Sequence, residues 1–471
     1  MEFVGLIGII LALVLFLVLT YKGHSVFWTS VICSAVVIVF HFASLKIDDA
    51  ITAYFSNISM MITQIGAIIL GGVMLGKVFT DSGAAESIAN ALIKKFVIGR
   101  TNKKTQVRLA ILALLILAGA CTMGGIDGFV LTFSLFPICV VVAKMVDIPR
   151  RFIPAMLCVN AAFMAAPGAP QINNIMAIAG MHTAGFEVTV TSAWIPGLVS
   201  TIIILLGGYF TLTYMIIKAM NNGETFDFGA MRPFEHDDTK KLPNPFVAII
   251  PLVVVFFLYT VLPLIVKTVH VNIFIALAAG IVVNIILMGG YLPRKNEKGE
   301  SISFFGAIGK SLDGGAHQYP NAIMTIVTPA GFAGVIMASS TFAWIIGNLA
   351  GVQLNFMLLT FVSVAVIVGI TSSPPVALMV AIPLVMGILG HSLSASELAD
   401  SAPGIMRVAA ITATTFETLP FNGLIMVTIG LAASTHKKSY RPQMYMTVVW
   451  TLVGALVAAG LIVLFPSLGA M

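Results

Sequence analysis

Long apolar runs follow one another from one end of the 471-residue chain to the other, beginning with VGLIGIILALVLFLVL and VFWTSVICSAVVIVFHFA. Each run is close to the roughly 20 residues that a helix needs to cross a bilayer. Hydrophobic residues make up 59% of the chain and charged residues only 9%, so little sequence remains for a soluble domain. The mean hydropathy of +1.03 agrees with this. The sequence therefore predicts an all-α integral membrane protein.

Several of these runs have the length and composition of uninterrupted membrane helices. The first run has neither a basic start nor a small-residue cleavage site, so we interpret it as a span and not as a signal peptide. All four cysteines fall within apolar segments without metal-ligand spacing, which predicts buried thiols. We expect unbroken spans near residues 2–20, 24–43, 57–80, 190–218, 245–267, 270–290, 318–340 and 442–466.

Four further apolar segments are interrupted in the middle by glycine, proline and polar residues. In the first half these are 107–144, interrupted at 121–128, and 151–181, interrupted by the text AAPGAPQINN at 165–174. In the second half they are 353–391, interrupted at 371–375, and 402–434, interrupted at 416–422. We expect the first segment of each pair to form a re-entrant helical hairpin and the second to form a broken helix.

The breaks come in the same order in both halves of the chain. An offset of 250 residues carries Gly119 onto Gly369 and Pro170 onto Pro420. We interpret this order as a duplication. The predicted domains are a first repeat at 1–218, a polar cytoplasmic linker at 219–244 and a second repeat at 245–471.

The formal charge of +6 indicates membrane topology and not nucleic-acid binding, because the basic residues lie in short loops. If the hairpins re-enter and the N-terminus is outside, all 25 Lys and Arg residues face inward except Lys46, Lys267 and Arg407. Each half then crosses the membrane an odd number of times, which inverts the second repeat. The full prediction is about ten spans, two re-entrant hairpins and two broken helices, with both termini outside.

A broken backbone inside a bilayer leaves N–H and C=O groups without helical partners, so it persists only against protein or a water-filled cavity. Paired breaks in an inverted repeat are typical of secondary transporters, whose site lies where the repeats meet. Half-helix N-termini suit an anion, and free carbonyl groups suit a cation. The sequence thus predicts a transporter that couples a small organic anion to H⁺ or Na⁺.

The polar residues and glycines at the four breaks are the candidate binding residues. Hydroxyl and amide groups there can bind a hydroxylated carbon chain or a dehydrated Na⁺, and Asn174 is expected to face the same opening. Asp127 and Glu417 are the only carboxylates at the breaks, and either suits a proton carrier. The predicted substrate- and ion-binding residues are Thr122, Gly124, Gly125, Asp127, Pro167, Gly168, Gln171, Asn173, Thr371, Ser372, Ser373, Glu417, Thr418 and Asn422.

Structural interpretations of the same residues remain open. Glycine and proline also make simple kinks, and Asn and Thr also join neighbouring helices by hydrogen bonds. Asp127 is equally compatible with a helix cap, and Glu417 with a structural partner. Arg407 is compatible with extension to the membrane surface or with binding of an anion.

Two other functional classes also remain open. A channel can use re-entrant loops, although its filter usually comes from repeated rings around a pore. A membrane-embedded enzyme needs a nucleophile with a base or a metal cluster, and no group of His, Cys and acidic residues is found at the breaks.

With these motifs in place, the chain resembles the gluconate permease family of organic acid symporters, within the ion transporter superfamily. The resemblance covers most of the chain and rests on GGVMLGKVFTDSGAAESIANALIKKF, GFVLTFSLFPICVVVA and AAPGAPQINN. It implies an inner-membrane homodimer that carries a sugar acid or related carboxylate together with H⁺, through an elevator-like motion of a transport part against a scaffold. Na⁺ coupling is the nearest alternative. No other cofactor, metal or nucleic-acid partner is expected.

The chain departs from the family pattern at three positions. Ile126 stands where the pattern has an acid, Ala166 where it has a histidine, and Leu419 where an acid precedes the proline. A smaller or less hydroxylated acid than gluconate is therefore an equally good expectation.

Overall fold

A computed structural model describes residues 2–22, 24–96, 99, 101–126, 128–229, 231, 241–266, 271–294, 300–350, 355–371, 374–390, 392–420 and 422–470. These residues form helices and no β-strand, as the sequence predicts. All four cysteines are free and buried, which confirms the expectation for them.

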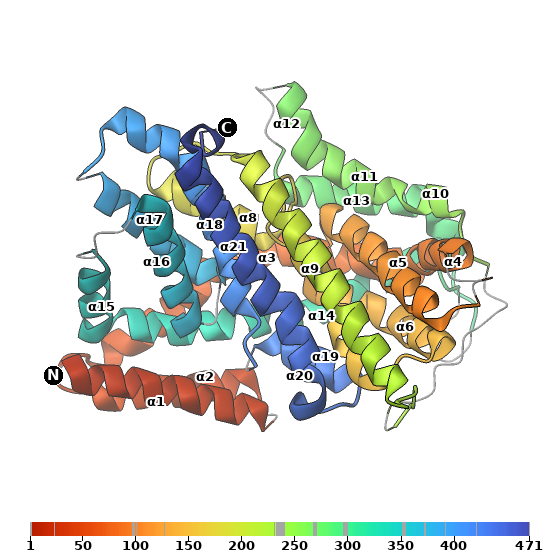
Figure 1. Cartoon of the computed structure of the whole chain (residues 1–471), viewed down its shortest axis with the longest axis horizontal. Coiled ribbons are helices and arrows are strands. Elements are labelled where there is room, and N and C mark those ends of the chain that lie inside the picture. The colour runs from red at the N-terminus through yellow and green to blue at the C-terminus, as the bar shows by residue number, and fades with distance from the viewer. Residues whose placement is uncertain are drawn as a thin grey trace.

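The first half of the chain runs from α1 to α9 (Figure 1). Its helices are α1 (Glu2–Tyr21), α2 (Val26–Phe40), α3 (Ile47–Asp81), α4 (Ala84–Phe96), α5 (Lys103–Met123), α6 (Gly128–Val146), η1 (Arg150–Phe152), α7 (Ile153–Leu157), η2 (Val159–Phe163), α8 (Ile172–Thr183) and α9 (Trp194–Asn221).

The second half runs from α10 to the C-terminus and includes two short π-helical stretches, η3 and η5. Its helices are α10 (Pro245–Ala248), α11 (Ile250–Phe256), η3 (Phe257–Val261), α12 (Leu262–Ile265), α13 (Ile273–Met288), η4 (Gly289–Tyr291), α14 (Phe304–Met337), α15 (Ser340–Ala350), α16 (Phe356–Thr371), α17 (Pro374–Leu389), α18 (Ala395–Glu417), α19 (Gly423–Leu431), α20 (His436–Met444), η5 (Tyr445–Val449), α21 (Trp450–Leu464) and η6 (Pro466–Leu468).

All four breaks lie where the sequence predicts them. The chain leaves α5 after Met123 and α16 after Thr371, and it leaves α18 after Glu417. Before α8, residues 164–171 are not helical, and a 3₁₀ turn precedes them. Two of the breaks need glycine for their backbone conformation. Gly125 and Gly168 have φ angles of +83° and +80°, which residues with a Cβ atom rarely adopt.

Four helices in the described part of the chain are long and apolar enough to cross a membrane: Lys103–Met123, Trp194–Asn221, Ile273–Tyr291 and His436–Leu464. Other predicted spans form shorter apolar helices, among them Glu2–Phe16, Phe27–Phe40 and Pro245–Val261. The first of the four is one arm of a predicted hairpin, so length alone does not separate a re-entrant arm from a span. The expectation of about ten spans stays a prediction.

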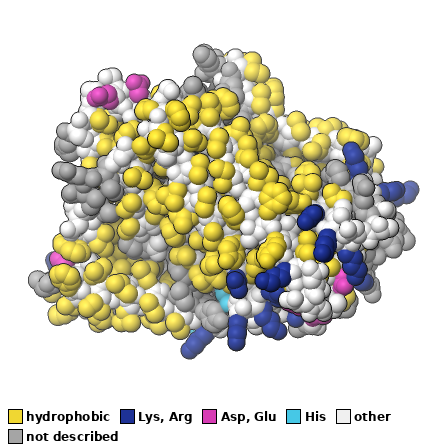
Figure 2. Space-filling view, viewed as in Figure 1, with side chains coloured by type: hydrophobic (Ala, Val, Ile, Leu, Met, Phe, Trp, Pro, Cys, Tyr) yellow, Lys and Arg dark blue, Asp and Glu magenta, His cyan; other side chains and the backbone are white. Residues whose placement is uncertain are grey.

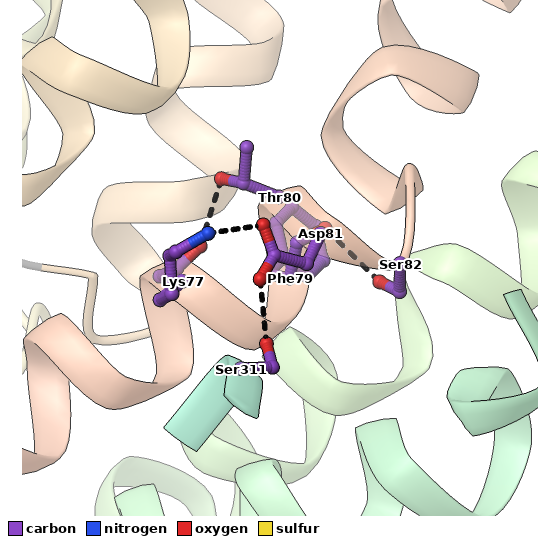
Figure 3. A network of polar contacts seen from close by, with 7 residues as sticks. Lys77, Phe79, Thr80, Asp81, Ser82 and Ser311 are labelled. Carbon is purple, nitrogen blue, oxygen red and sulfur yellow. Dashed lines mark hydrogen bonds and ion pairs between the residues drawn. The ribbon is translucent and has the colours of Figure 1, made fainter. Parts of the chain in front are cut away.

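The two longest helices, α3 and α14, pack along each other and join the two halves of the chain. A Cβ atom on Gly315 of α14 would lie 2.8 Å from the Cα atom of Met74, so this glycine permits the close approach. Asp81, at the end of α3, accepts hydrogen bonds from Lys77 and, at 2.8 Å, from the Ser311 hydroxyl of α14 (Figure 3). Asp81 and Ser311 thus form a polar contact at one end of the apolar α3–α14 interface.

Helices that flank the breaks pack into a second group. Helix α17 contacts both α8 and α18, and α16 contacts α18. A Cβ atom on Gly180 of α8 would lie 2.9 Å from the Leu378 carbonyl oxygen of α17, so these two helices also meet at a glycine. This packing brings the second hairpin, the first break and the second break together.

Charge is unevenly distributed over the surface. On the face in Figure 2, Lys and Arg side chains gather at the lower right and hydrophobic side chains cover the middle. Lysines stand in the last turns of α4, α6 and α9. An apolar surface bounded by basic helix ends is typical of a chain that lies in a bilayer.

Candidate functional site

The two broken helices meet through a side-chain hydrogen bond. Asn173, in the first turn of α8, donates from its Nδ2 atom to Oε2 of Glu417 at a distance of 3.3 Å. Glu417 is the last residue of α18 and is half-buried, whereas Asn173 is fully buried. Two predicted binding residues that lie 244 positions apart are therefore in contact.

Gln171 joins the first break to the first hairpin. Its Nε2 atom donates to the backbone oxygens of Thr122, at 2.7 Å, and Ile126, at 3.3 Å. Thr122 lies in the last turn of α5, where its carbonyl oxygen also accepts from the Gly125 N–H, and Ile126 lies in the turn between α5 and α6. The residue that precedes α8 thereby binds carbonyl groups at the end of α5 and in the turn that follows.

Several buried oxygen atoms around the breaks lack a hydrogen-bond partner among the described residues. They are Oε1 of Gln171, Oδ1 of Asn173 and the hydroxyl oxygens of Thr415 and Thr418. Each side chain is at most 6% exposed. Buried polar atoms are normally paired, because an unpaired one costs about 1–3 kcal/mol. These atoms belong to residues of both breaks, which the Asn173–Glu417 contact joins, so buried polar groups suited to a polar ligand or an ion lie on both sides of that contact.

The start of α8 adds a positive helix end to this group. Gln171 is its N-cap residue, but its side chain makes no cap hydrogen bond and is instead bound to the hairpin. The first N–H groups of a helix have no intrahelical partners, and the helix dipole favours negative charge there. The carboxylate of Glu417 lies against this end through Asn173.

Arg407 holds the backbone around the first break. It is 0% exposed, and its guanidinium donates to the carbonyl oxygens of Ala165, Val190 and Ser192 at 2.5–3.1 Å. It also donates to Oδ1 of Asn174 at 2.9 Å. The alternative in which Arg407 extends to the membrane surface is therefore wrong. The positive charge is buried beside the break.

Asn174 closes the turn at the first break. Its Nδ2 atom donates to the carbonyl oxygens of Ala166 and Ala169 at 2.8 and 2.9 Å, and its Oδ1 atom accepts from Arg407. Because both ends of the amide are bound within the protein, Asn174 does not face an opening as expected. It fixes the geometry of the break.

Gly168 contacts the second half of the chain. Its carbonyl oxygen accepts from the Thr260 hydroxyl in η3 at 2.6 Å, and its N–H donates to Val190 at 3.0 Å. A Cβ atom on Gly168 would lie 2.8 Å from Cγ2 of Thr260. The π-helical turn thus packs directly on the first break. Such turns are frequently found at functional sites.

Other predicted residues of the first half take packing positions. The Thr122 hydroxyl donates to Ala118 at 2.8 Å, and Pro167 lies against Gly197 of α9. Cβ atoms on Gly124 and Gly125 would meet side chains of α11 and α13, at 2.6 Å from Cβ of Leu252 and 3.0 Å from Cγ1 of Val255. The hairpin tip therefore rests on the first helices of the second half.

At the second break, the unwound carbonyl groups are bound by α20. The His436 ring contacts the Pro420 carbonyl oxygen at 2.9 Å through Nε2, and the Tyr440 hydroxyl donates to the Thr418 carbonyl oxygen at 3.3 Å. Asn422 caps α19 by accepting from the Leu424 N–H at 2.8 Å. In the described part of the second break, Glu417 contacts Asn173 of the first break, and the buried Thr418 hydroxyl has no hydrogen-bond partner.

Some predicted site residues lie outside the described residues. These are Asp127, Ser372 and Ser373. Thr371 ends α16, but its side chain is not described. Their predicted roles stay predictions.

Two further residues near the breaks were not predicted from the sequence. Thr415 lies two residues before the end of α18, within the threonine-rich text TATTFETLP, which is a usable signal of a polar helix end. Thr260 lies in an apolar stretch that carried no such signal. Its contact depends on the π-helical turn, which a hydrophobic pattern does not reveal.

Comparison with known proteins agrees with this architecture. Residues 3–464 match the family described as GntP family permease. An uncharacterized transporter of Bacillus subtilis (strain 168), YxjC, is 24% identical over 95% of this chain and 96% of its own length. The crystal structure of the YdaH transporter of Alcanivorax borkumensis shares the fold, with 14% identity, a TM-score of 0.51, and coverage of 89% of this chain and 88% of that one. Because a permease family accounts for nearly the whole length, the chain is a transport protein and not an enzyme, and it belongs to the GntP family of permeases.

Proposed function

We propose that this permease is an H⁺-coupled symporter of a small organic anion, either a gluconate-like sugar acid or another small carboxylate. The observation that carries the proposal is the Asn173–Glu417 contact, together with buried oxygens in residues of both breaks that have no partner within the described part of the chain. Hydroxyl groups of Thr415 and Thr418 donate to a carboxylate, and the amide oxygens of Gln171 and Asn173 accept from substrate hydroxyl groups. The start of α8 favours the negative charge.

The carboxyl group of Glu417 can link the binding of substrate to the binding of H⁺. An ionised carboxylate repels a substrate carboxylate at close range, and a protonated one donates a hydrogen bond to it. Substrate binding therefore favours the protonated form of Glu417, and the two are carried together. A single carboxylate that titrates in a buried polar site is a common proton carrier in transporters.

Na⁺ coupling is the second candidate, and the same oxygens favour it. Amide, hydroxyl and carboxylate oxygens are the ligands that hard cations prefer. Gln171, Asn173, Thr418 and Glu417 supply four side chains of this kind. In that case Na⁺, and not H⁺, neutralises Glu417.

For the movement, we propose an elevator-like motion in an inverted repeat, with repeats at 1–218 and 245–471. The order of helices supports this, because each half contains a long helix, a hairpin and a broken helix in turn. The hairpins and breaks pack together, while α3 and α14 form a separate long contact that suits a scaffold. A homodimer in the inner membrane, with both termini outside and the linker 219–244 inside, completes the proposal.

Uptake into proteoliposomes, with pH and Na⁺ gradients imposed separately, tests the function. Radiolabelled gluconate and the three-carbon acid glycerate are suitable probes, after a thermal-shift screen of further small carboxylates on the purified protein. We expect accumulation when the outside is acidic, and loss of accumulation with a protonophore. Accumulation with the Na⁺ gradient alone supports the second candidate. If neither gradient drives any carboxylate, the symporter proposal is wrong.

A further inference from the structure

A cleft of about 810 Å³ lies beside the first break and is distinct from the group of buried oxygens. Residues 187–191 form one side, and Tyr259, Thr260 and Pro263 of η3 and α12 form the other. His182, in the last turn of α8, stands at one end. The volume lies in the range of small-molecule sites, about 300–1,000 Å³, so a small carboxylate fits with room for water.

The cleft is connected to the first break by hydrogen bonds. Thr260 lines the cleft and donates to the Gly168 carbonyl oxygen at 2.6 Å. Val190 lines the opposite side, and its carbonyl oxygen accepts from the Gly168 N–H at 3.0 Å. Both sides of the cleft thus touch one residue of the break. The cleft thus lies next to the glycine turn of the break.

Positive charge stands behind one side of the cleft. The Arg407 guanidinium donates to the Val190 carbonyl oxygen at 2.5 Å and is bound there only by neutral groups among the described residues. A buried charge without a bound counter-charge creates a positive potential in its surroundings. At the mouth, the Glu187 carboxylate lies 3.3 Å from His182, but its side chain is 95% exposed and therefore strongly screened by solvent.

The surface of the cleft has groups that recognise an organic acid. The hydroxyl oxygens of Thr189 and Thr191 lie 3.1 Å apart at its edge and can bind a carboxylate or a substrate hydroxyl group. The Tyr259 ring provides an apolar wall for a carbon chain. The combination is that of a weak site for a small, hydroxylated anion.

We infer that this cleft is an entry site, where the transported organic anion binds before it passes the Gly168 turn to the group of buried oxygens. The inference rests on the proposed function for the identity of the anion. It assigns to residues 187–191 and to Tyr259 a role in substrate capture. The buried oxygens of Gln171, Asn173, Thr415 and Thr418 then receive the same anion in a second step.

Thiol labelling measures the charge preference of the cleft directly. Thr191→Cys, in full-length protein in proteoliposomes, is treated separately with the anionic sulfonatoethyl and the cationic trimethylammonioethyl methanethiosulfonate. Thr183→Cys is the matched control, because Thr183 is exposed at the same end of α8 but does not line the cleft. We expect the ratio of anionic to cationic labelling rates to be about fivefold higher at Thr191 than at Thr183.

Transport kinetics give a second readout. Thr189→Glu places a carboxylate at the cleft edge, and Thr183→Glu places one outside it. We expect the first change to raise the KM of the carboxylate that the uptake assay identifies by roughly threefold or more, with little change in maximal rate, because entry is disfavoured by like charge. We expect the control to leave both unchanged. Thr191→Cys protein that carries the anionic sulfonatoethyl label is expected to show the same rise in KM.

The outcomes separate the entry site from the proposed function. An equal or lower labelling ratio at Thr191, or no labelling there, overturns the entry site, even if wild-type protein transports a carboxylate. Unchanged KM in Thr189→Glu does the same. If wild-type protein carries no carboxylate but Thr191 keeps its anion preference, the cleft still binds anions and only the proposed function fails.

Discussion

The side-chain amide of Asn173 donates to the carboxylate of Glu417, and this one contact joins the start of α8 to the end of α18. Gln171, two residues earlier, extends the connection to the first hairpin through the carbonyl oxygens of Thr122 and Ile126. Three of the four breaks are thus linked by two neighbouring amides. Within the described part of the chain, each amide keeps one buried oxygen without a hydrogen-bond partner, so the connection leaves acceptor groups available to a ligand.

Glu417→Gln is expected to separate coupling from binding. The amide keeps the shape and hydrogen-bonding capacity of the side chain but cannot carry a proton. We expect uptake driven by a pH gradient to fall by about tenfold or more, while exchange of external for internal substrate persists. Comparison of the two assays on the same proteoliposomes checks this. Full retention of pH-driven uptake contradicts the role of Glu417 as proton carrier.

Asn173→Ala tests the same contact from the other side. It removes the Asn173 amide as one donor to the Glu417 carboxylate, and it removes the buried Oδ1 acceptor of Asn173. We expect substrate affinity to fall by roughly tenfold, equivalent to about 1.4 kcal/mol, as judged by the KM of uptake. Unchanged binding and transport in both this variant and Glu417→Gln contradicts the site assignment.

Gln171→Leu is expected to lower both stability and substrate binding. The change removes the Gln171 amide donor from the carbonyl oxygens of Ile126 and of Thr122, the latter keeping the Gly125 N–H, at a cost of about 1–3 kcal/mol. Gln443→Leu is the matched control, because Gln443 is also fully buried and donates to Thr428 at 2.6 Å, and none of its hydrogen bonds to described residues reaches α8 or the α5–α6 turn. Thermal unfolding in detergent should show a loss in both variants, but only Gln171→Leu should lose the stabilisation that substrate gives.

The location of the breaks was predictable from sequence, whereas their connections were not. Glycine and proline in apolar runs identify a break, because φ and missing N–H groups are local properties. The partner of a polar side chain depends on helix packing, and no pattern placed Gln171 against the α5–α6 turn. Arg407 shows the limit most clearly. A lone arginine near the end of a predicted span signals function or surface contact, yet its donors bind carbonyl groups that lie about 215–242 residues away.

Arg407→Met is expected to be the most destabilising of these substitutions. It removes the guanidinium donor from the buried carbonyl oxygens of Ala165 and Ser192 and leaves that of Val190 with the Gly168 N–H alone, and we expect a loss of about 3–5 kcal/mol. Arg151→Met is the control, since its partner Glu224 lies at the surface and such a pair contributes about 0–1 kcal/mol. The yield of folded protein after mild heating measures both. Equal yields contradict the role of Arg407 in holding the break.

Gly168→Ala tests the contact between the first break and η3. Two effects add up: a φ of +80° costs a residue with a Cβ atom about 1–2 kcal/mol, and the new Cβ lies 2.8 Å from Cγ2 of Thr260. Thr260→Ser removes that methyl group and keeps the hydroxyl that donates to Gly168. In a double-mutant cycle on thermal stability and uptake, we expect Gly168→Ala to be less damaging by about 1 kcal/mol in the Thr260→Ser background. The remaining loss measures backbone strain. If the loss is equal in both backgrounds, η3 does not pack on the break as the structure describes.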